Sequence, residues 1–224
     1  MTRRFTLPAP IRLAVVAALA IALAGTALVL VPKQDGHEVG AATKISRSGF
    51  HDAMRVLWED HIVWTRMAII GILDDRPDQA SAVDRLLRNQ DDIGDAIKPF
   101  YGDEAGEQLS TLLRAHITGA ADLLIAARSG DDDAVGAALT AWRANGDEIA
   151  AFLATANPNQ WPLAEMKPMM RDHLDLTLDE AIARLEGRFV DDIAAYDAIH
   201  GQILHMADML SDGIIAQFPS HFTR

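Results

Sequence analysis

The sequence contains no cysteine. This absence excludes disulfides, thiolate metal sites, cysteine nucleophiles and a lipid-modified cysteine anchor. Aromatic residues make up only 6% of the 224 residues, and runs of Val, Ile, Thr and Tyr are nearly missing after the first 35 residues. Half of the residues are hydrophobic, and alanine and leucine dominate among them. This composition disfavours strands and predicts an all-α fold with a sizeable core.

Basic residues are also scarce. The formal net charge is −12, although three arginines, Arg3, Arg4 and Arg12, stand near the start without any acidic residue beside them. The remainder of the chain is therefore more acidic than the net charge suggests. Such a surface repels nucleic acid and anionic lipid headgroups, so we expect no nucleic-acid partner.

Several catalytic signatures are missing. The sequence has no Gly-rich phosphate loop, no Gly-x-Ser-x-Gly and no alternation of strands with helices. These absences argue against nucleotide-dependent chemistry and the common hydrolase plans, and they leave no catalytic residue to assign. A binding protein is favoured over an enzyme.

The first 32 residues look like a membrane anchor or signal segment. Residues 13–31 form an uncharged apolar run of 19 residues behind the arginines, close to the length of about 20 residues that spans a bilayer. We expect a tether to the cell membrane with the body on the extracytoplasmic side. Gly40-Ala41-Ala42 offers an alternative cleavage site, in which case the body is secreted.

Residues 33–48 read as a polar linker, and residues 49–218 as a helical-bundle domain. Apolar residues recur at intervals of three and four, and Gly, Pro or acidic residues separate the segments. Six helices are predicted, at residues 49–74, 79–98, 103–129, 131–157, 163–186 and 191–218. Pro168 is a candidate to delay the start of the fifth helix.

Three histidines fall on predicted core faces at a nearly constant interval. His61, His116 and His173 lie in the first, third and fifth helices, and about 55 residues separate each from the next. Asn89, Asn145 and His200 fall on the predicted core faces of the second, fourth and sixth helices, where apolar residues surround them at helical spacing, and they recur at nearly the same interval. This pattern predicts three pseudo-repeated helical hairpins of about 55 residues each.

Imidazoles that converge inside a bundle are natural ligands for Zn, Cu or Fe. The predicted divalent-metal site consists of His61, His116 and His173, with His200 and Asp197 as further ligands. Asp197 and His200 resemble the carboxylate-x-x-His pairs of metal-binding bundles. In the competing interpretation each histidine bonds a Thr, an Asn or a carbonyl of its own hairpin, with Thr65, Thr177, Asn89 and Asn145 as partners.

Five stretches carry a resemblance to a known family. They are LWEDHIVWTR, DRLLRNQDDI, WRANGDEIAAFLA, RDHLDLTLDEAIARL and YDAIHGQILHMADML, and together they cover most of residues 54–218. They resemble a family of uncharacterised bacterial helical-bundle proteins. Some relatives carry glycosyltransferase or acetylglutamate kinase names, which no sugar-nucleotide or nucleotide motif of this sequence supports. The resemblance implies a helical body and no particular activity.

Two functions compete at this point. The first is an extracytoplasmic bundle that binds a metal ion or metal cofactor through its core histidines. The second is a metal-free bundle that senses a small ligand or binds a protein partner, with the polar core residues setting the helix register.

Overall fold

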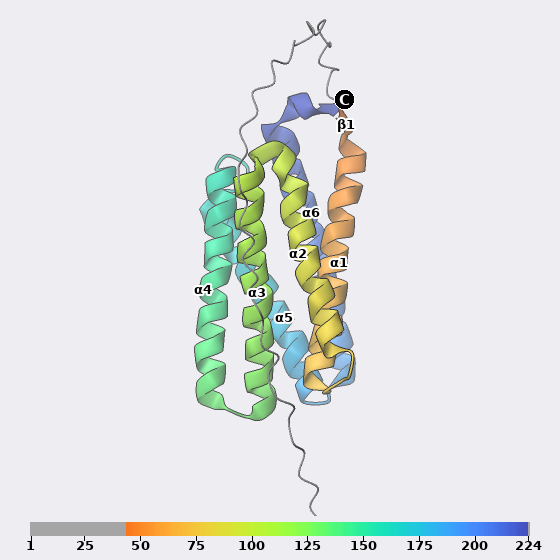
Figure 1. Ribbon diagram of the computed structural model, residues 1–224, viewed down its shortest axis with the longest axis vertical. Coiled ribbons are helices and arrows are strands. Elements are labelled where there is room, and N and C mark those ends of the chain that lie inside the picture. Colours follow the sequence, from red (N-terminus) through yellow and green to blue (C-terminus); the bar gives the residue numbers. More distant parts are fainter. Residues whose placement is uncertain (1–43, 224) are drawn as a thin grey trace, which may run out of the picture. The chain divides into compact units, whose positions relative to one another are not determined.

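The computed structural model describes residues 44–223 of the chain, and the predicted anchor at residues 13–31 lies outside them. Six helices make up nearly all of the described part (Figure 1). They are α1 (Arg47–Leu73), α2 (Gln79–Tyr101), α3 (Asp103–Ser129), α4 (Asp132–Ala156), α5 (Leu163–Leu185) and α6 (Phe189–Gln217). The predicted all-α bundle of six helices is confirmed. Among residues 44–223, no helix is both long and apolar enough to cross a bilayer.

The predicted helix boundaries differ from the observed ones by at most a few residues, because local chemistry sets them. Asp131 caps α4 by accepting a hydrogen bond from the Ala134 amide at 3.0 Å. Gly130 ends α3 in the left-handed conformation, with φ at 72°. The linker prediction runs two residues too far, since α1 begins at Arg47 behind the capping side chain of Ser46. Pro168 does not delay α5, which begins at Leu163.

The helices form a closed antiparallel ring. Each packs against its neighbours in the sequence, and α6 packs against α1 to close the ring. Figure 1 shows the helices side by side, with their connections at the two ends. Helix α1 also contacts α3 and α5. The odd-numbered helices α1, α3 and α5 therefore lie nearest to the centre of the bundle.

A small parallel strand pair corrects the expectation of a fold without any β-structure. Strand β1 (Ile45–Ser46) pairs with β2 (Phe222–Thr223), which follows a short 3₁₀ turn, η1 (Pro219–His221). Next to this pair, the ring of Phe222 stacks on Phe100 and meets Phe50 edge-on, with centroids 5.6 and 5.2 Å apart. The apolar contact of the three rings holds the C-terminal segment against the start of α1, which local sequence patterns do not predict.

Candidate metal centre

The three predicted core histidines meet in the middle of the bundle. His61 on α1, His116 on α3 and His173 on α5 are only 2%, 4% and 4% exposed. The ring centroid of His173 lies 5.9 Å from that of His61 and 6.1 Å from that of His116. The predicted approach of the histidines is confirmed for these two pairs, with His173 between the other two.

The layers next to the histidines explain why the helices bury them. One turn earlier on α1, α3 and α5 lie Trp58, Leu113 and Met170, and one position later lie Ile62, Ile117 and Leu174; all six are buried. These residues repeat at the same intervals as the histidines. Because the buried apolar neighbours of each histidine occupy equivalent positions on the three helices, the packing of these helices brings the three imidazoles to the same depth.

Two of the imidazoles each contact a side-chain amide of the following helix. Nδ1 of His116 lies 3.1 Å from Oδ1 of Asn145, and Nδ1 of His173 lies 3.1 Å from Oε1 of Gln202. The NH₂ groups of the same amides donate to the carbonyls of Leu112 and Met169. Because the amide oxygen can only accept, each Nδ1 carries the proton, and the lone pair is left on Nε2.

The first hairpin departs from this arrangement. Gln90 follows His61 at the same sequence interval at which Asn145 follows His116, but its Nε2 donates to Asn89 and to the carbonyl of Leu86. In this hairpin Asn89, and not Gln90, donates to a backbone carbonyl of the preceding helix, that of Leu57. Within residues 44–223, Nδ1 of His61 and Oε1 of Gln90 both lack a hydrogen-bond partner. His61 is consequently the least constrained ring of the three.

The three imidazoles are neutral at physiological pH. Burial, together with the charge that His173 would carry, lowers the pKa of His116 to about 3 against the opposing effect of the hydrogen bond with Asn145. Burial also lowers the pKa of His61 well below its usual value, with contributions from His173 and His116, and lowers the pKa of His173. Neutral imidazole is the form that binds metal ions.

The other two predicted ligands lie elsewhere. His200 is half-buried on the outer side of α6, where its Nε2 lies 2.7 Å from a carboxylate oxygen of Glu59 on α1. Asp197 is exposed. The prediction that His200 lies on the core face of α6 is wrong, since the buried face carries Ile199 and Ile203. Gln202, two residues further on, occupies the position that the hairpin interval requires.

Four polar side chains were predicted as partners of the imidazoles: Thr65, Thr177, Asn89 and Asn145. Of these, only Asn145 contacts an imidazole nitrogen. The hydroxyls of Thr65 and Thr177 donate to the backbone carbonyls of His61 and His173, one turn back on their own helices. Gln90 and Gln202 were missed from the sequence. A search for amides at one fixed interval after each histidine would have found both.

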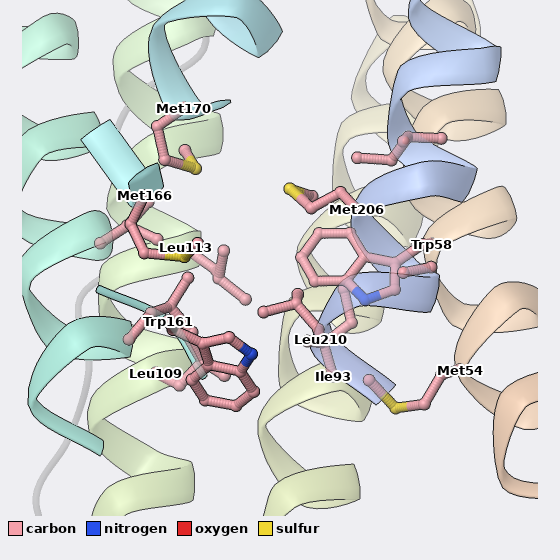
Figure 2. Packing of buried hydrophobic residues seen from close by; sticks show 14 of the residues in the cluster. Met54, Trp58, Ile93, Leu109, Leu113, Trp161, Met166, Met170, Met206 and Leu210 are labelled. Carbon is pink, nitrogen blue, oxygen red and sulfur yellow. The ribbon is translucent and has the colours of Figure 1, made fainter. Parts of the chain in front are cut away.

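A cavity lies beside the histidines. Its volume is about 40 Å³, and all three histidines line one part of it. The other lining side chains are almost entirely apolar, among them Met54, Ile93, Leu109 and Ile149. Figure 2 shows the sulfur atoms of Met170 and Met206 turned toward the same space from opposite sides. We call this cavity the chamber.

The spacing of the rings sets what they can hold. Two imidazoles on one tetrahedral zinc have ring centroids about 5 Å apart, because each Zn–N bond is about 2.0–2.1 Å long. The observed separations of 5.9 and 6.1 Å are wider than this. Within residues 44–223, no group of three His, Cys, Asp or Glu side chains has metal-binding geometry as it stands. An ion shared with His173 therefore requires each of these two ring pairs to close by about 1 Å.

A second polar cluster was missed from the sequence. Glu180 on α5 is fully buried, and one of its oxygens lies 2.6 Å from Nη1 of Arg66. The same Nη1 lies 2.8 Å from Asp192, which is 1% exposed and also meets Arg184. Burial raises the pKa of Glu180 to about 7, Arg66 opposes the rise, and Asp192 adds to it. The sequence did contain a signal for the burial of Glu180, since this residue lies seven positions after His173 and therefore on the same face of α5.

Comparisons with protein-family models, with curated proteins and with solved structures return no significant match.

Proposed function

We propose that this protein is a membrane-tethered, extracytoplasmic helical bundle that binds a transition-metal ion through His61, His116 and His173. One observation carries the proposal: two adjacent buried imidazoles each have an amide oxygen 3.1 Å from Nδ1, which leaves the ring's lone pair on Nε2. Metal-binding histidines show this arrangement, because a hydrogen bond to the other ring nitrogen fixes the tautomer and the ring orientation.

The repeat supports a site with three histidine ligands. The intervals from Gln90 to Asn145 and from Asn145 to Gln202 equal those between the histidines. Three hairpins related by pseudo-repetition bring equivalent side chains to a common axis. His61 completes the set, since its Nδ1 and the oxygen of Gln90, both unpartnered within the described residues, can form the third hydrogen bond when the ring turns toward the ion.

The residues limit the identity of the ion. Neutral imidazole suits Zn, Cu and Fe, and no carboxylate of residues 44–223 lines the chamber, which disfavours Mg and Ca. The thioethers of Met170 and Met206 line the same chamber and add soft donors near the site. Three nitrogen ligands leave one position of a tetrahedral ion open.

Metal titration of the purified, metal-free protein tests the proposal. Calorimetry with Zn, Cu and Fe salts should give one ion per chain, and X-ray absorption should show about three nitrogen neighbours at about 2.0–2.1 Å. His173→Gln should weaken affinity at least about 100-fold, and Asn145→Ala about 10- to 100-fold. His200→Gln is the matched control, because this side chain pairs with Glu59 at the surface. Equal binding by the protein and by His173→Gln would reject the site.

A metal-free bundle is the second candidate. It is favoured by the hydrogen bonds that already satisfy Nδ1 of His116 and His173. In that case the histidines set the register of the hairpins. This candidate requires two results. None of the tested metals should bind stoichiometrically, and Asn145→Ala should lower the stability of the protein.

The tether is the part of the proposal that rests on residues 13–31, outside the described structure. Protease treatment of intact spheroplasts should digest the body while the protein stays in the membrane fraction. A body that is protected and remains in the cytoplasmic fraction contradicts the proposed topology. Release of the body into the medium would show that the segment is cleaved.

A further inference from the structure

The chamber is too small for an organic cofactor. Its volume is about 40 Å³. A cavity needs roughly 10–15 Å³ to hold one water molecule, and one that binds benzene measures about 150 Å³. Room therefore exists for a molecule of two or three heavy atoms.

The polarity of the chamber favours an uncharged occupant. Away from the histidines, its wall is made of aliphatic, thioether and aromatic side chains such as Ile97, Leu153 and Ile214. A buried water molecule needs two to four hydrogen bonds, which this apolar part of the wall, away from the histidines and Trp58, does not supply. A weakly polar molecule loses little on leaving water for this space.

One hydrogen-bond donor on the chamber wall has no partner in the part of the chain that the structure describes. Trp58 lies one turn before His61, is 6% exposed and lines the chamber. Its Nε1–H is buried and unpartnered within residues 44–223. Two other buried tryptophans do donate: Trp142 to the carbonyl of His116, and Trp161 to that of Met209. An unpaired buried N–H is costly, so this donor points to a ligand that accepts a hydrogen bond.

The chamber shares part of its lining with a groove on the surface, which provides a route of access. A groove on the outside of α2, α3 and α4 is lined by Ala105, Gln108, Ala151 and others. Tyr101, Phe152 and Ala156 line both this groove and the chamber. A small molecule that passes from one to the other therefore crosses between these three side chains.

We propose that the chamber admits an uncharged diatomic molecule through Tyr101, Phe152 and Ala156, and that this molecule takes the open position of the histidine-bound ion and accepts a hydrogen bond from Trp58. Binding at the ion rests on the proposed function, whereas entry into the chamber does not. Dioxygen, nitric oxide and carbon monoxide share the required size and lack of charge.

Xenon tests the chamber without any metal. Crystals of the metal-free protein under xenon pressure should show a xenon atom between Met170, Met206 and Leu210, and Leu210→Phe should abolish it by filling the space. A second apolar cavity, bordered by Thr65 and Thr177, provides an internal reference. Xenon found only in that second cavity, or nowhere, overturns the proposal.

Nitric oxide tests the ion. Protein loaded with ferrous iron should bind nitric oxide in a one-to-one ratio, and Trp58→Phe should speed its dissociation about 5- to 10-fold through loss of the hydrogen bond. Trp64→Phe is the matched control, since Trp64 does not line the chamber. Ala156→Leu should slow association about tenfold, whereas Ala151→Leu, on the groove alone, should leave it unchanged.

The outcomes separate the two proposals. If the protein takes up no metal, the proposed function fails, and xenon still decides whether the chamber admits a small molecule. If iron binds through the three histidines but nitric oxide does not, the further inference fails and the metal site stands. Equal nitric oxide dissociation from the Trp58→Phe and Trp64→Phe variants rejects the role of the indole.

Discussion

The side-chain oxygen of Asn145 lies 3.1 Å from Nδ1 of His116, and the NH₂ group of the same amide donates to the carbonyl of Leu112. One amide thus contacts both the backbone and the ring of the preceding helix. The arrangement recurs in the next hairpin with Gln202 and His173. It predicts the tautomer of each imidazole.

Nuclear magnetic resonance of the ring nitrogens checks this tautomer. At pH 7, without metal, His116 and His173 should both carry the proton on Nδ1. Asn145→Leu should release His116 into a tautomer mixture and leave His173 unchanged, which makes His173 the internal control. An Nε2–H tautomer of His116 in the unaltered protein is incompatible with the proposed metal ligand.

The buried histidines predict a loss of stability in mild acid. Each binds a proton in the unfolded chain near pH 6.5, whereas the pKa of folded His116 is about 3. The contribution of His116 is complete above about pH 6.5 and decreases as the pH falls toward about 3, by about 1.4 kcal/mol per pH unit. The pKa values of His61 and His173 are also lowered by burial, so both change stability in the same direction. Urea unfolding between pH 7 and 5 measures this slope. His116→Leu should reduce the slope, and exposed His205→Gln should not; an unchanged slope in His116→Leu contradicts the prediction.

Glu180 predicts the opposite trend in alkali. Its pKa in the folded protein, about 7, lies above the unfolded value of 4.5, so its contribution is present in acid and is lost as the pH rises through about 7. The loss amounts to at most about 3 kcal/mol. Glu180→Gln should therefore lose less stability than the unaltered protein between pH 5 and 9. Asp179→Asn, at an exposed neighbouring position, should follow the unaltered protein. Parallel curves for all three proteins would count against a raised pKa.

Two glycines of α6 form a matched pair. A Cβ atom on Gly213 would lie 2.2 Å from Nε1 of Trp161, while one on Gly201 would meet nothing within 4 Å. Gly213→Ala should cost about 1–3 kcal/mol by displacing the indole that lines the chamber. Gly201→Ala should stabilise the helix by up to about 1 kcal/mol. Chemical denaturation measures both changes, and a neutral Gly213→Ala would show that the indole yields freely.

Sequence patterns located the helices because their signals are local. Asp131, Gly130 and Gly187 lie at helix ends, where capping and the left-handed backbone favour their residue types. The interval between His61, His116 and His173 likewise reveals a common depth, since each histidine lies within an apolar stripe of its own helix. These features need no knowledge of the neighbouring helices.

Helix α6 shows where reasoning from the sequence failed. His200 was predicted to face the core because apolar residues surround it at helical spacing, yet Ile199 and Gln202 take the inward positions. A rotation of one residue, about 100°, separates these choices, and α6 carries apolar residues around most of its circumference. Only its packing against α1 and α5 selects the face.

The sequence by itself determined an all-α body, the ends of its six helices and the burial of three histidines, because periodicity and capping act within one helix. The tertiary structure decided which amide meets each ring, and it placed Glu180 beside Arg66 and Asp192, from three different helices. It also left the Trp58 indole at the chamber wall without a hydrogen-bond partner among residues 44–223. Such contacts depend on the rotation and depth of helices packed against one another, which no local pattern encodes.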